Sequence, residues 1–67
     1  METNNKQNAV VMFNAEKALK EAIHVLETTP DVKLKADVGI VIDTLGLAQQ
    51  YCRMLGNDFN GYFPKFN

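Results

Sequence analysis

The side chains able to do chemistry are few and far apart in this sequence. It has one histidine, His24, and one cysteine, Cys52. A histidine can transfer protons near neutral pH, and a cysteine thiolate can act as a nucleophile. However, His24 lies beside Glu21 and Glu27 on the polar face of a predicted helix, which indicates a solvated surface histidine. Cys52 falls in an apolar row, where we expect a small buried side chain.

No other arrangement of residues predicts catalysis or metal binding. Asp37 and Asp43 lie on different faces of a predicted helix, which argues against a pair of catalytic carboxylates. One cysteine and one histidine cannot supply the four ligands of a structural zinc from one chain. Gly39 and Gly46 are too isolated to form a phosphate-binding loop. We therefore expect no enzyme activity, no cofactor and no metal site.

The aromatic residues point to binding instead. Four of them lie in the segment NDFNGYFPKFN at 57–67, which we call the aromatic tail: Phe59, Tyr62, Phe63 and Phe66. Gly61 and Pro64 argue against a helix in this segment. An apolar patch of this kind is usually covered or bound.

Two interpretations of the aromatic tail stay open. In the first, its rings fold back over the hairpin or over a neighbouring subunit. In the second, they anchor a partner protein or a flat ligand, with Tyr62 suited to a wet boundary. For a nucleotide, a ring would stack on the base while Lys65 or Arg53 neutralises phosphate. The candidate binding residues are Phe59, Tyr62, Phe63, Lys65, Phe66 and Arg53.

The first predicted helix covers residues 9–28. Apolar residues recur there at alternating steps of three and four, which is typical of an amphipathic helix: Met12, Ala15, Leu19, Ala22 and Leu26. A further three widen this row on one side: Val11, Ala18 and Val25. Thr29 and Pro30 then suit the N-cap and first position of a new helix. The short connection predicts that the two helices are antiparallel.

The second predicted helix covers residues 30–55. Its row keeps the same steps: Leu34, Val38, Val41, Leu45, Ala48, Cys52 and Leu55. The β-branched run VGIVID at 38–43 is also compatible with a strand. We prefer the helix, because a single strand would have no partner for its backbone groups. Gly39 and Gly46 oppose this choice, since each costs about 1 kcal/mol in a helix interior. Gly56 with Asn57 suggests where the helix stops.

The second helix has more apolar surface than one partner can cover. Four residues form a second face: Ile40, Leu47, Tyr51 and Met54. Ile42 lies beside Gly39 and Gly46, whose missing side chains would let another backbone approach. A helix that is apolar nearly all round is normally buried. These seven residues are the predicted oligomer interface, and packing against the aromatic tail alone is the alternative.

Composition bounds the remaining choices. A 67-residue chain with a single cysteine cannot form an internal disulfide, so self-association is the expected extra source of stability. The net charge is −1 and no basic block is present, so nucleic acid ranks below a protein partner or a small ligand. No apolar run approaches the ~20 residues that span a bilayer. The polar start METNNKQN lacks the features of a secretory signal, and we expect a cytoplasmic protein.

The sequence therefore predicts an all-α fold. Residues 1–67 form a single domain, an antiparallel two-helix hairpin with an aromatic C-terminal tail, completed as a dimeric or higher coiled-coil-like bundle. The form of residues 9–56 resembles small accessory proteins of phages and plasmids. That class includes hairpin dimers that bind regulatory RNA and hairpin oligomers that sequester nucleotide signals. The resemblance is one of architecture and implies no particular site residues.

The expected function is binding without catalysis. The chain would occupy or sequester a protein partner or a small nucleotide ligand as a homo-oligomer. One alternative is an RNA-binding dimer, in which Phe13 stacks on a base and lysines on the same side of the first helix contact phosphates: Lys6, Lys17 and Lys20. The other is a purely structural subunit of a larger assembly, with the aromatic tail exchanged onto the next copy.

Overall fold

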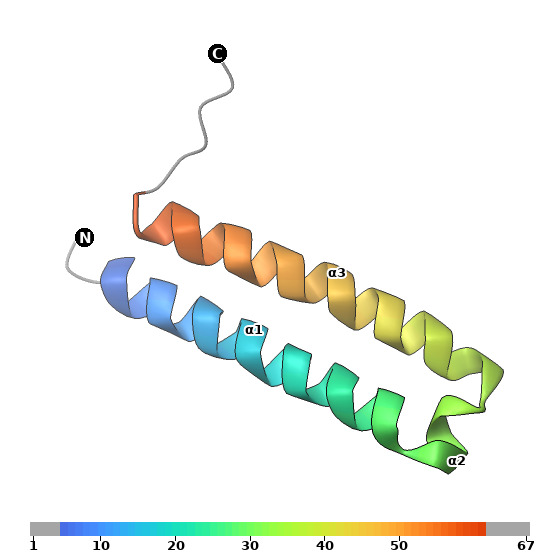
Figure 1. Cartoon of the computed structure of the whole chain (residues 1–67). Coiled ribbons are helices and arrows are strands. Elements are labelled where there is room, and N and C mark those ends of the chain that lie inside the picture. Colours follow the sequence, from blue (N-terminus) through green and yellow to red (C-terminus); the bar gives the residue numbers. More distant parts are fainter. Residues whose placement is uncertain (1–4, 62–67) are drawn as a thin grey trace.

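The computed structural model describes residues 5–61 and shows a helical hairpin (Figure 1). Helix α1 covers Asn5–Thr28, the single turn α2 covers Pro30–Lys33, and α3 covers Ala36–Phe59. The two long helices lie side by side and run in opposite directions, with α2 at the closed end. The predicted all-α antiparallel hairpin is confirmed. The run VGIVID at 38–43 lies inside α3, so the strand interpretation is wrong.

Two threonines end α1. The hydroxyl of Thr28 donates to the carbonyl oxygen of His24 at 2.7 Å, and the hydroxyl of Thr29 donates to that of Val25 at 2.7 Å. The carbonyl oxygen of Val25 also accepts the backbone N–H of Thr29 at 3.1 Å, so the threonine hydroxyls add to the backbone hydrogen bonds at the end of α1. Thr29 is extended and Pro30 follows it at the start of α2, as predicted. The predicted cap by the Thr29 side chain is absent: the hydroxyl donates to α1 and accepts no hydrogen bond from an early amide of α2.

The helix boundaries differ from the prediction at three places. The α1 helix begins at Asn5 rather than at residue 9. The second predicted helix is broken, because Lys35 adopts an extended conformation (φ −77°, ψ 130°) between α2 and α3, which leaves Leu34 exposed. Helix α3 then continues through Gly56 to Phe59. The glycine with a positive φ (80°) is Gly61, so the predicted stop at Gly56 is wrong.

The contact between α1 and α3 is a single seam. On α1 the predicted row is half-buried, but the seam widens toward Phe13, Glu16 and Ile23 rather than toward the exposed Val11 and Val25. On α3 the seam repeats at steps of four and three. We call these α3 residues the inner seam: Val38, Ile42, Leu45, Gln49, Cys52, Gly56 and Phe59.

The inner seam is rotated relative to the predicted row of the second helix. Val38, Leu45 and Cys52 belong to both, but Val41 and Leu55 stay exposed. The sequence offers apolar residues on both sides of the shared positions, so periodicity alone does not fix the rotation. In the observed rotation of α3, Gly56 and Arg53 contact residues of α1, as described below.

The hairpin has very little core. Only Ala9 and Gly56 are buried among residues 5–61. The smallest dimension of the molecule is 13 Å, close to the ~10–12 Å diameter of one helix with its side chains. Each long helix therefore keeps one side on its partner and the others on the surface.

Candidate functional site

The structure describes two of the six candidate binding residues, Phe59 and Arg53. The other four, Tyr62, Phe63, Lys65 and Phe66, lie outside the described residues, so their role stays a prediction. Phe59 is the last residue of α3 and is half-buried at the end of the inner seam. It therefore belongs to the helix rather than to a separate tail.

Arg53 joins α3 to α1. Its Nε donates to Oε2 of Glu16 at 2.7 Å, and its Nη2 lies 2.7 Å from the same oxygen. The Glu16 side chain is 13% exposed and that of Arg53 is 56% exposed. Among the described residues, this cross-helix contact is the ion pair that Glu16 forms. The exposed part of the guanidinium is what a ligand can reach.

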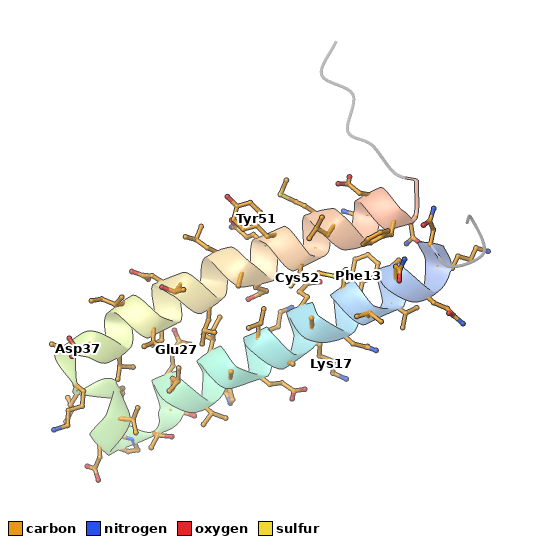
Figure 2. All side chains as sticks on the ribbon, turned by 180° about the vertical axis from the view of Figure 1, so that it is seen from behind. Phe13, Lys17, Glu27, Asp37, Tyr51 and Cys52 are labelled. Carbon is orange, nitrogen blue, oxygen red and sulfur yellow. The ribbon has the colours of Figure 1, made fainter. Side chains whose placement is uncertain are left out.

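Phe13 packs on Gly56. A Cβ placed on Gly56 would lie 2.6 Å from Cε1 and 2.7 Å from Cζ of the Phe13 ring, closer than real Cβ atoms approach other atoms. The missing side chain therefore makes the space that the ring fills. Phe13 and Cys52 lie on the sides of the two helices that face each other (Figure 2).

The contact between Phe13 and Gly56 bears on the RNA-binding alternative. A half-buried ring held against α3 is not free to stack on a base. Lys6, Lys17 and Lys20 remain exposed on α1. Phosphate contacts by these lysines remain compatible with the structure, and the predicted aromatic contact does not.

The histidine and the cysteine lie apart. His24 is exposed on α1, as predicted, and Cys52, predicted to be buried, is half-buried in the inner seam. Within residues 5–61, no cluster of three or more His, Cys, Asp or Glu side chains is arranged to hold a metal ion. Two surface depressions lie along α1, and each is lined by α1 residues alone. No helix in the described part of the chain has the length and apolarity to cross a membrane.

The predicted oligomer interface falls on three sides of α3. Four of its residues share the side facing away from α1 and are strongly exposed: Ile40 (67%), Leu47 (56%), Tyr51 (61%) and Met54 (57%). Figure 2 shows Tyr51 pointing away from α1. Ile42 belongs to the inner seam instead. Gly39 and Gly46 have no atom within 4 Å of an added Cβ, so no contact in the described residues requires a glycine there.

Thr44 completes the outward-facing row. It lies between Ile40 and Leu47 and is exposed, and its hydroxyl donates to the carbonyl oxygen of Ile40 at 2.8 Å. This internal bond satisfies the hydroxyl, so Thr44 can lie in an apolar contact. We call the following residues the outer seam: Ile40, Thr44, Leu47, Tyr51 and Met54.

Comparison with protein-family models, with curated proteins and with solved structures finds no match for this chain. The class of protein is therefore defined by the structure: an all-α helical hairpin in which α3, as long as α1, carries a second, uncovered seam.

Proposed function

We propose that the chain is a noncatalytic binding protein that works as a homo-oligomer of helical hairpins. It occupies or sequesters a partner, either a protein or a small nucleotide ligand. The observation that carries this proposal is the outer seam, four large apolar side chains that are each more than half exposed. The described residues offer no cluster of reactive side chains beside it.

The energetics of the hairpin support association. Each fully buried large apolar side chain contributes about 1.5–3 kcal/mol, and no large side chain is fully buried in the described residues. Chains of this size usually need a further source of stability. Covering the outer seam would supply one without any change in the hairpin.

The two candidate binding residues that the structure describes lie toward one end of the hairpin. Arg53 lies six residues before Phe59, about 9 Å along the axis of α3. The other four candidates follow Gly61 in the sequence. Aromatic rings and an arginine are the side chains that most often dominate protein interfaces. The same set suits a nucleotide, with a ring on the base and the exposed part of Arg53 toward phosphate.

Native mass spectrometry of protein purified from its host tests the proposal. We expect an oligomer that retains a protein or small-molecule ligand. A monomer that retains nothing would refute the proposal.

A truncated chain ending at Gly61 separates the two roles of the aromatic tail. The truncation must keep residues 57–61, because α3 extends to Phe59 and the chain turns at Gly61. We expect the truncated protein to keep its oligomeric state and lose the ligand. Loss of the oligomer would favour the structural-subunit alternative.

A further inference from the structure

We propose that the outer seam of α3 pairs with the outer seam of a second copy, with the two α3 helices antiparallel and centred near Leu47. This inference rests on the proposed homo-oligomer and specifies its surface, its partner and its direction. It places α3 between two helices, its own α1 on one side and the partner copy on the other.

The position of the outer seam carries the first step. Ile40, Leu47 and Met54 each follow an inner-seam residue by two positions, about 200° around the helix. The outer seam therefore lies opposite α1. Its residues recur at steps of four and three, the spacing at which apolar residues of two helices interlock. The seam is thus a second helix-packing surface rather than scattered exposed residues.

The exposed area suits a helix partner. From their exposed fractions, the four large side chains offer on the order of 500 Å² per copy, or about 1,000 Å² in total for a symmetric pair, near the lower limit for a specific interface. No charged residue belongs to the seam between Ile40 and Met54. The next positions at the same spacing are Asp37 and Asp58, both exposed at the ends of the seam. The uncharged stretch between them is what an equally apolar seam can cover.

Side-chain size favours a second copy in the antiparallel direction. Reversing the seam about Leu47 places Ile40 against Met54 of the second copy, and Thr44, the smallest member, against Tyr51, the largest. A parallel pair would instead place Tyr51 on Tyr51 and Thr44 on Thr44, which crowds one level and leaves a gap at another. Interfaces pack to the density of protein interiors, so the complementary order is preferred.

The segments outside the described residues cannot cover the whole seam. Residues 1–4 and 62–67 adjoin Asn5 and Gly61 in the sequence, and the described chain has both of these ends at the open end of the hairpin, opposite α2 (Figure 1). Ile40 lies nineteen residues before Phe59, about 29 Å along the axis of α3. Six fully extended residues reach about 20 Å. The aromatic tail can reach Met54 but not Ile40, and a second copy can cover both.

Leu47→Lys tests whether the outer seam is the pairing surface. Gln50→Lys, at another exposed position of α3, is the matched control. The control adds the same charge outside the seam. By analytical ultracentrifugation, we expect Leu47→Lys to weaken dimer formation at least about 100-fold, as for the loss of a central interface anchor, and Gln50→Lys to change it less than about threefold. Loss of association by Leu47→Lys alone supports the pairing, whether or not helix content falls with it. Equal association of both variants would overturn it.

Disulfide formation tests the direction. In a Cys52→Ala background, Thr44→Cys and Tyr51→Cys chains are prepared separately, mixed, unfolded, refolded together and oxidised. Antiparallel pairing predicts disulfides between the two different variants. Disulfides only within each variant would overturn the antiparallel order, and the absence of any disulfide would overturn the seam.

These results are distinguishable from failure of the proposed function. A full-length chain that is monomeric without a ligand refutes both proposals. An oligomer that tolerates Leu47→Lys refutes only the pairing through the outer seam. A chain that associates only when truncated after Gly61 shows that the aromatic tail occupies the seam, which also overturns the pairing.

Discussion

Gly56→Ala tests the closest contact in the hairpin. In a helix interior, alanine is more stable than glycine by about 1 kcal/mol. At Gly56 the new methyl would lie 2.6 Å from the Phe13 ring, so the ring must move. Overpacking of this kind costs about 1–3 kcal/mol. We therefore expect a net loss of about 0–2 kcal/mol of unfolding free energy.

Gly46→Ala is the matched control on the same helix. No atom lies within 4 Å of an added Cβ at Gly46, so only the gain of about 1 kcal/mol applies. The two variants should differ by about 1–3 kcal/mol, or at least about 4–8 °C in Tm for a chain of this size. Urea and thermal unfolding by circular dichroism measure the difference. The protomer concentration must be held constant, because association contributes to Tm.

A double-mutant cycle assigns the cost of Gly56→Ala to the ring. In a Phe13→Leu background, Gly56→Ala should lose most of its penalty, which gives a coupling energy of about 1–3 kcal/mol. If Gly56→Ala stabilises the protein as much as Gly46→Ala does, the packing of the Phe13 ring does not require a glycine at position 56. That result would refute the proposed cost of overpacking.

Three further substitutions test other features. Arg53→Gln should cost about 0.2–1 kcal/mol, since the Arg53 side chain is more than half exposed; urea unfolding with and without 1 M salt measures it, and the loss should vanish in a Glu16→Gln background. Gly39→Ala should raise stability by about 0.5–1 kcal/mol; a loss in thermal unfolding would show that another chain packs on this glycine. Gly61→Ala should cost about 1–2 kcal/mol, because φ at this position is 80°; an unchanged unfolding midpoint would show that this turn does not contribute to stability.

The sequence predicts the two long helices well because both carry sustained apolar rows. It also predicts the turn, since Thr29 and Pro30 interrupt the helix for local steric reasons. Local preference fails at Lys35, which has no breaking residue beside it and is extended because the chain must reverse direction there. The sequence alone contains no signal that separates α2 from α3.

The rotation of α3 about its axis depends on contacts distant in the sequence. Gly56 was interpreted as a helix stop from its type, yet it lies within α3 and accepts a ring from residue 13. Arg53 was predicted to neutralise the phosphate of a nucleotide ligand, and in the structure it pairs with Glu16 across the hairpin. Both contacts join residues more than thirty positions apart. Periodicity reports which residues share a face, and it cannot report which partner that face meets.

The outer seam was predictable because its assignment does not depend on contacts distant in the sequence. Ile40, Leu47, Tyr51 and Met54 are each more than half exposed on the side of α3 facing away from α1, so packing between the helices does not change their assignment. Ile42, a predicted interface residue, is half-buried in the inner seam toward α1. Residue type alone did not identify Thr44 as part of the outer seam. Its hydroxyl is hydrogen-bonded within its own helix, so this threonine can pack like a small apolar residue.

The locations of the tightest contacts have a consequence for how the hairpin opens. The backbone joins the two long helices at the end near α2. The closest contacts between them lie toward the other end: the buried Ala9, the Phe13 ring on Gly56, and the pair of Glu16 with Arg53. Helix ends far from a covalent link ordinarily fray first. Here, the amide hydrogens of the last turns of α3 should exchange with solvent more slowly than those near Lys35, so that transient opening starts beside the turn.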